Sequence, residues 1–239
     1  MHLLNANPSA PRGAIFDFDL TLADSTRAAA ACIDYALVSM GFDAVGPSRA
    51  RRTIGLSLEQ TFKDLTGESD AVAQSQFRAL FIEHADLVMV SQTDLLDGVP
   101  AAMDTLRAAQ IKLGIVSTKY RFRIEDILKR FELIDRFEVI VGGEDVAAHK
   151  PDPQGLTMAL KSLGLGSVEA VYVGDHVVDA EAARRASVPF VAVLSGESER
   201  RDFDSFPTVA VLKAVSQLPG YIASCGRWPP PGQATPPPF

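Results

Sequence analysis

The sequence predicts an α/β protein with a doubly wound parallel sheet and an all-helical insertion. Short, nearly continuous apolar runs recur along the chain, and amphipathic stretches of helical length separate the later runs. Strands that read as continuous apolar runs are typical of parallel sheets covered by helices on both faces. In such sheets ligands bind at the carboxyl ends of the strands. The residues that follow each strand are therefore the first place to look for chemistry.

Five apolar runs are the expected strands. They occupy residues 14–18, 111–117, 137–143, 169–175 and 188–194. Each run is followed by small or polar residues, as expected where a buried strand leaves the sheet. The amphipathic stretches between the later runs are the expected core helices, at residues 99–109, 121–130, 153–163 and 177–186.

Residues 24–94 break the alternation of strands and helices. Three helices are expected there, at residues 25–40, 57–65 and 69–89, with Gly41, Pro47 and Gly67 between them. We therefore expect a doubly wound (Rossmann-like) core domain from residues 1–23 and 95–218 and a helical cap domain at residues 24–94. An insertion after the first strand lies above the exit of that strand, where it can act as a lid.

Residues 219–239 are expected to form an extended or disordered tail. Proline dominates its end, in the stretch CGRWPPPGQATPPPF, and such a composition cannot build a core. A peptide ligand for a proline-binding domain is a possible second role for this segment.

Composition limits the classes of partner. A net charge of −7 disfavours a general nucleic-acid-binding protein, because such a protein has a basic face. Cys32 and Cys225 have no metal-ligand spacing and are expected as reduced thiols. The chain has no signal-peptide pattern at its start and no apolar run long enough to span a bilayer. A cytoplasmic protein without a membrane partner is expected, and a monomer and a dimer stay open.

Chemically active side chains follow the first four strands. Their positions are Asp17, Asp19 and Thr21 after the first strand, Ser117 and Thr118 after the second, Lys150 in HKPDP after the third, and Asp175 and Asp179 in GDHVVD after the fourth. Because parallel strands end at the same edge of a sheet, these groups should converge on one site.

This set of groups matches a metal-assisted phosphoryl-transfer site. Mg²⁺ prefers one or two carboxylates together with substrate phosphate, so Asp17 and Asp175 are the expected ligands. A carboxylate can also attack phosphorus, provided that a metal and an ammonium group such as that of Lys150 offset the negative charges. Asp19, where the chain leaves the strand, could protonate the leaving oxygen and later activate water.

The ordered motifs DFDLT, VST, HKPDP and GDHVVD resemble those of the haloacid dehalogenase-like hydrolase superfamily, in its branch with a helical cap after the first strand. The resemblance runs from about residue 13 to residue 216. The stretches LLDGVPAAMDTLRAAQIKLGIVSTK and IVGGEDVAAHKPDPQGL are especially similar to phosphoglycolate phosphatases.

The resemblance implies a role for each matching residue. Asp17 would be the nucleophile and Asp19 the general acid and base. Mg²⁺ would be held by the carboxylates of Asp17 and Asp175 and by the backbone carbonyl of Asp19. The implied phosphate-binding residues are Ser117, Thr118 and Lys150, and the implied supporting residues behind the ligands are Thr21 and Asp179.

The implied activity is a Mg²⁺-dependent phosphatase acting on a small phosphorylated metabolite, with 2-phosphoglycolate as the leading substrate. Inorganic pyrophosphate, nucleoside monophosphates and a sugar phosphomutase reaction remain alternatives, and so does a non-catalytic binding protein. Mutases with this cap usually carry a histidine just after the nucleophile loop, where this chain reads STRAAAA.

Two further features are candidates for substrate contact. In the cap, Arg51, Arg52, Thr53 and Gly55 precede a helix that starts near Ser57, and basic residues near a helix N-terminus favour anions. Next to Asp175, His176 stands where relatives often carry a smaller residue, and it could either line the site or reflect local packing.

Overall fold

The computed structural model describes residues 10–229. Its centre is a six-stranded sheet in the order β5-β4-β1-β6-β7-β8, in which every neighbouring pair is parallel. The strands are β1 (Gly13–Phe16), β4 (Lys112–Val116), β5 (Val139–Val141), β6 (Ala170–Gly174), β7 (Phe190–Val193) and β8 (Thr208–Leu212). The predicted α/β class with a parallel sheet is confirmed. The edge strand β8, TVAVL, was missed: its apolar run is short, and all of its residues are only half-buried.

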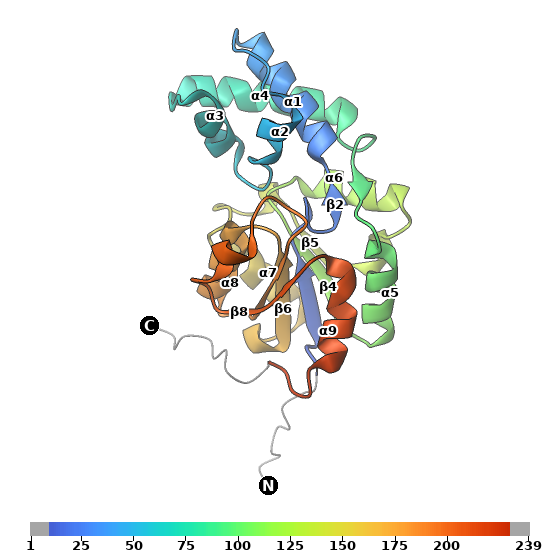
Figure 1. The fold of residues 1–239 in the computed structure, drawn as a ribbon. Helices are drawn as coiled ribbons and strands as arrows, with labels where there is room; N and C mark the ends of the chain where they lie inside the picture. The colour runs from blue at the N-terminus through green and yellow to red at the C-terminus, as the bar shows by residue number, and fades with distance from the viewer. Residues whose placement is uncertain (1–9, 230–239) are drawn as a thin grey trace.

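Helices cover both faces of the sheet (Figure 1). One face packs against α5 (Val99–Ala108), α6 (Arg121–Arg130) and α9 (Leu218–Ser224), and the other against α7 (Gln154–Leu163) and α8 (Val177–Ala186). Alternate residues of β1 serve the two layers, because Ala14 and Phe16 join the first and Ile15 the second. Short 3₁₀ turns complete the connections, at Ile134–Arg136, Gly143–Asp145, Ser167–Glu169, Arg200–Phe203 and Val215–Gln217.

The helical insertion lies over the carboxyl edge of the sheet (Figure 1). It contains α1 (Thr26–Ser39), α2 (Gly46–Arg51), α3 (Leu58–Thr66) and α4 (Ala71–Val88). The expected three helices are present, and the short α2 is an addition. A small antiparallel pair, β2 (Ala23–Asp24) and β3 (Asp94–Leu95), joins the insertion to the core. The insertion has an apolar core of its own, in which Phe62 and Phe77 are fully buried.

The expectation of an extended tail from residue 219 is wrong for its first part. Residues 218–224 form α9, whose Leu218 and Ile222 are buried against the core layer that also contains α5. Trp228 is fully buried in the same layer. Apolar burial therefore orders this segment in spite of the prolines that follow it. The remainder of the tail, residues 230–239, lies outside the described residues. Within residues 10–229, no helix has the length and apolar character to cross a membrane.

Candidate active site

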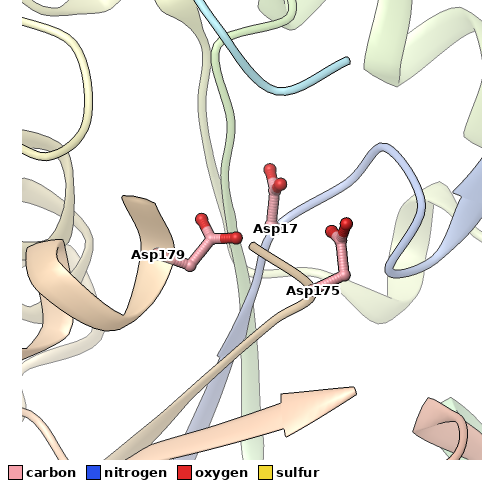
Figure 2. A group of neighbouring side chains, drawn as sticks. All are labelled: Asp17, Asp175 and Asp179. Atoms are coloured by element: carbon pink, nitrogen blue, oxygen red, sulfur yellow. The ribbon is translucent and has the colours of Figure 1, made fainter. Parts of the chain in front are cut away.

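Three carboxylates meet where β1 and β6 leave the sheet (Figure 2). Asp17 directly follows β1, Asp175 directly follows β6, and Asp179 lies in the first turn of α8. All three are buried, and one carboxylate oxygen from each lies within 4.8 Å of the others. Asp17 and Asp175 are 158 positions apart in the sequence. They lie close together because β1 and β6 are neighbours in the sheet.

Lys150 provides the positive charge beside this cluster. Its Nζ lies 2.6 Å from Oδ1 of Asp179 and 3.0 Å from Oδ1 of Asp17, and only 5% of its side chain is exposed. The lysine stands in the loop between β5 and α7, so a third strand exit reaches the site. The structure thus brings together Asp17, Lys150, Asp175 and Asp179, as the parallel-sheet argument predicted.

Tyr172 also belongs to this network, although the sequence analysis did not identify it. Its hydroxyl accepts a hydrogen bond from Lys150 Nζ at 3.3 Å. The single hydroxyl proton can be donated to Oδ1 of Asp179 at 3.0 Å or to the Val116 carbonyl at 3.2 Å. The signal was a phenol within the apolar run of β6, a position where a buried hydroxyl requires a partner.

We expect Tyr172→Phe to lower the free energy of unfolding by about 1–3 kcal/mol, because it leaves buried acceptors without their donor. The variant should also lower kcat several-fold, since Lys150 and Asp179 lose a shared contact. Urea unfolding and steady-state kinetics measure the two effects. Tyr221→Phe is the matched control, because the Tyr221 hydroxyl bonds the Val209 carbonyl away from the site. A kcat unchanged by Tyr172→Phe would show that Tyr172 only stabilises the core.

Burial sets the charge state of the cluster. Burial raises the pKa of Asp17 to about 6, against the opposing effect of Lys150. Burial and the neighbouring Asp179 likewise raise the pKa of Asp175 well above its usual range. For Lys150, burial alone would lower the pKa, but the charges of Asp17 and Asp179 outweigh it and the pKa is raised. The lysine is therefore charged at neutral pH, and the carboxylates have a deficit of compensating positive charge.

The donor set fits a hard divalent cation. Oδ1 of Asp17 is buried and, despite its proximity to Lys150, makes no hydrogen bond with any described residue. Asp175 is oriented by Thr21, whose hydroxyl donates to its Oδ1 at 2.9 Å and leaves Oδ2 for another partner. Carboxylate oxygens of this kind are the ligands that Mg²⁺ prefers. Asp179, in contrast, has both oxygens engaged, Oδ1 with Lys150 and Tyr172 and Oδ2 with the backbone N–H of His176.

Gly196 is a second residue that the sequence analysis missed. A Cβ at this position would lie 1.9 Å from Oδ2 of Asp175, so a side chain there would force the carboxylate to move. The backbone after β7 thus passes directly behind a candidate metal ligand. The glycine was not noticed because nothing in its local sequence indicates this close approach.

Asp19 has a cationic partner of its own in Lys119. Nζ of Lys119 lies 3.2 Å from Oδ1 of Asp19, and both side chains are less than one-tenth exposed, at 6% and 8%. Directly after Asp19 the chain turns at Leu20, which has a left-handed φ of 58°, and then leads to the insertion. Lys119 was also missed, although it directly follows Ser117 and Thr118 in the sequence.

Ser117 and Thr118 lie at the exit of β4, as expected. Ser117 continues the pairing with β5 through its backbone N–H, and its side-chain oxygen is near the backbone N–H of Lys119 at 3.4 Å. The hydroxyl of Thr118 contacts the Gly55 carbonyl of the insertion at 3.4 Å. Thr118 therefore touches the cap as well as the core.

A cavity of about 180 Å³ separates the insertion from the sheet edge. Asp19, Thr118 and Lys119 line it from below, and Thr53 and Gly55 line it from the insertion. Thr53 and Gly55, two of the cap residues expected to contact substrate, are therefore next to this cavity. Arg51 and Arg52 are not among the lining residues.

Arg51 instead connects the insertion to the core. Its guanidinium pairs with Glu197 at 2.6 Å and with Asp24 at 3.6 Å, and it bonds the Ser195 carbonyl at 2.8 Å. Arg52 is exposed. His176 caps α8, because its Nδ1 accepts a hydrogen bond from the backbone of Val178 at 3.2 Å. This contact agrees with the packing interpretation of that histidine.

Comparisons with known proteins give a consistent result. Residues 14–193 match the family model described as haloacid dehalogenase-like hydrolase. The phosphoglycolate phosphatase of Yersinia pseudotuberculosis is 32% identical over 77% of this chain and 82% of its own, and that of Xanthomonas campestris is 28% identical over 92% and 99%. The crystal structure of a putative haloacid dehalogenase-like hydrolase from Bacteroides fragilis superposes with a TM-score of 0.84 at 38% identity, covering 87% of this chain and 99% of that one.

Proposed function

Because the chain belongs to the haloacid dehalogenase-like hydrolases, we propose that it is a Mg²⁺-dependent phosphatase with 2-phosphoglycolate as its leading substrate. The observation that supports this most is the convergence of Asp17, Asp175 and Lys150 at one sheet edge. The choice of substrate is supported by the relatives named phosphoglycolate phosphatases, which match up to 92% of this chain.

In the first step, a carboxylate oxygen of Asp17 attacks the phosphorus, and the bond between phosphorus and the alcohol oxygen breaks. The product is an aspartyl-phosphate on Asp17 and a free alcohol. Asp19, on the turn after β1, donates its proton to the departing oxygen, so that an alcohol rather than an alkoxide leaves. Lys119, 3.2 Å from Asp19, then stabilises the carboxylate that this transfer creates.

In the second step, Asp19 takes a proton from a water molecule while the water oxygen attacks the phosphorus. The acyl-phosphate bond breaks, phosphate leaves, and Asp17 and Asp19 return to their starting states. Ser117 would hydrogen-bond a phosphoryl oxygen, and Lys150 would offset charge on the phosphoryl group and on Asp17, to which it lies at 3.0 Å.

The ion would be held by the carboxylates of Asp17 and Asp175 and by the backbone carbonyl of Asp19. A bound Mg²⁺ supplies charge that offsets repulsion between an anionic nucleophile and an anionic phosphoryl group. Thr21 orients Asp175 by a hydrogen bond, and Gly196, which has no Cβ, leaves room for its Oδ2. Tyr172 and Asp179 orient Lys150 by accepting hydrogen bonds from its Nζ.

We expect Mg²⁺ to raise the Tm more at pH 8 than at pH 5. Burial raises the pKa of Asp17 to about 6, so at pH 5 an ion must displace a proton, whereas at pH 8 the carboxylate is already ionised. An ion present at about 100 times its Kd adds about 2.7 kcal/mol, or roughly 5–10 °C for a chain of this size. Thermal melts with MgCl₂ and with EDTA at both pH values measure the effect. Equal shifts at pH 5 and pH 8 would contradict this account.

The metal-free protein should have the opposite dependence on pH. A pKa raised from 3.8 to about 6 means that the folded state binds this proton more tightly than the unfolded chain does. The contribution of Asp17 to stability is therefore present below about pH 4 and falls as the pH rises to about 6. The EDTA arm of the same melts tests this sign.

A panel of phosphorylated metabolites, assayed with Mg²⁺ and with EDTA, tests the proposed function. We expect Mg²⁺-dependent release of phosphate, with the highest kcat/KM for 2-phosphoglycolate. A preference for pyrophosphate or nucleoside monophosphates would replace the substrate but keep the chemistry. Transfer of phosphate between positions of a sugar phosphate would indicate a mutase. Folded protein with no turnover on any member would favour a binding protein.

A further inference from the structure

Arg123 is a buried cation in the cavity beneath the insertion, away from the carboxylate cluster. It lies in the first turn of α6, and only 5% of its side chain is exposed. Lys119, four residues before Arg123 in the sequence, lines the same cavity. Two buried cations thus stand in the space next to Asp19, where the alcohol part of a substrate would lie.

The guanidinium of Arg123 is held on several sides. One terminal nitrogen bonds Oδ1 of Asp86 at 2.5 Å and the Ile82 carbonyl at 3.2 Å, both on α4. Cζ of the guanidinium lies over the rings of Tyr120 and Phe122, at 5.2 and 5.1 Å from the ring centroids. These contacts fix the side chain before any ligand binds, which lowers the entropy cost of recognition.

One donor of this fixed guanidinium has no partner. Nε of Arg123 is buried and makes no hydrogen bond with any described residue. A buried donor without an acceptor costs free energy unless a ligand supplies the acceptor. The same cavity also has apolar residues in its wall, among them Ile33, Phe81 and Met89 from the insertion. From a buried guanidinium, a charge-assisted bond to an anionic oxygen is stronger than a bond to a neutral oxygen.

We propose that Arg123 determines specificity by binding a carboxylate on the alcohol part of the substrate, so that the enzyme selects phosphomonoesters of hydroxy acids. This inference rests on the proposed function, because it assumes that the phosphoryl group lies at Asp17 and the alcohol in the cavity. Nε–H of Arg123 donates to one carboxylate oxygen. Lys119, which pairs with Asp19 and lines the same cavity, adds positive charge that favours the same anion.

Matched substrate pairs test this role. Ethyl phosphate replaces the carboxylate of 2-phosphoglycolate by a methyl group, and glycerol 3-phosphate replaces that of 3-phosphoglycerate by a hydroxymethyl group. We expect the wild-type protein to prefer the carboxylate member of at least one pair. Arg123→Met should lower kcat/KM for that member about 10- to 100-fold, mainly through KM, and change its partner less than about twofold.

Arg121→Met is the matched control, because Arg121 lies on the same helix, pairs with Asp145 at 3.1 Å and does not line the cavity. It should leave both members of each pair unchanged. Arg123→Lys keeps the charge but lacks Nε, so it provides a second variant if Arg123→Met does not fold, and it should lose the same preference. Equal losses for both members of a pair, or no preference in the wild-type protein, would overturn the inference.

Calorimetric titration with glycolate separates this inference from the proposed function. Binding of glycolate to the wild-type protein that is weakened at least tenfold by Arg123→Met supports a carboxylate subsite even if no substrate in the panel turns over. If phosphomonoesters turn over but Arg123→Met does not change glycolate binding, the proposed carboxylate subsite is wrong. The proposed phosphatase activity would then still stand.

Discussion

Asp17→Asn should lower kcat by at least about 10⁴-fold while the protein stays folded, because an amide cannot form the covalent phosphoryl intermediate. The substitution is nearly isosteric, and Lys150 keeps its contact with Asp179 at 2.6 Å. Burial already disfavours the charged form of Asp17, whose pKa is raised to about 6. Removal of that charge should therefore leave the metal-free Tm at pH 8 unchanged or slightly higher.

The same variant should lose most of the Mg²⁺-dependent rise in Tm, since one of the two candidate carboxylate ligands is gone. Steady-state kinetics and thermal melts with and without Mg²⁺ measure the two effects on one sample. Asp97→Asn is the control, because Asp97 is exposed, in the loop between β3 and α5. Hydrolysis at a near-native rate would rule out Asp17 as the nucleophile. If the variant has no turnover but keeps the full Mg²⁺-dependent rise in Tm, Asp17 remains the nucleophile but other residues hold the ion.

The part of the site predicted from sequence is the part that topology dictates. Parallel strands end at one edge, so residues that directly follow β1, β4 and β6 converge whatever their side chains are. Asp17, Ser117 and Asp175 could be placed on that ground alone. The same reasoning placed Lys150, because α7 begins at the same edge of the sheet.

Residues whose role depends on side-chain contacts could not be predicted in this way. Tyr172 reads as one more apolar strand residue until its hydroxyl is seen between Lys150 and Asp179. Gly196 matters only through its distance to Asp175. Arg123 reads as a polar residue on an amphipathic helix, and its burial depends on α4, which packs over it from the insertion.

The fold shows the same division. The four inner strands were predicted from their apolar runs and so was the edge strand β5, whereas β8 at the other edge, whose residues are all half-buried, was missed. The segment around α9 was assigned to a tail because prolines follow it. Its order depends on long-range packing of Leu218, Ile222 and Trp228, which composition cannot reveal.

Lys150→Met should lower both activity and stability, and both losses should come from the missing ammonium charge. Without the ammonium group, no described lysine or arginine lies within ion-pair distance of Asp17 or Asp179. We expect kcat to fall by about 10²–10³-fold or more, because a cation aimed at the developing charge is lost. Removal of one partner of a buried pair should also lower the free energy of unfolding by about 3–5 kcal/mol at pH 8.

The loss of stability should be smaller at pH 5 than at pH 8. Lys150 is the group that opposes the effect of burial on the pKa of Asp17, so its removal raises that pKa further. The folded variant then holds protons that the unfolded chain releases above about pH 4, and its stability falls as the pH rises through this range. At pH 5 the carboxyl of Asp17 is largely protonated and needs less compensation. Urea unfolding in EDTA at both pH values measures the difference.

Lys161→Met is the matched control, because Lys161 is exposed in the last turn of the following helix, α7. It should change neither kcat nor the dependence of stability on pH. Equal losses of stability at pH 5 and pH 8 in Lys150→Met would mean that lost packing, rather than uncompensated charge, destabilises the variant. A retained kcat would contradict the view that the ammonium group allows one anion to attack another at this sheet edge.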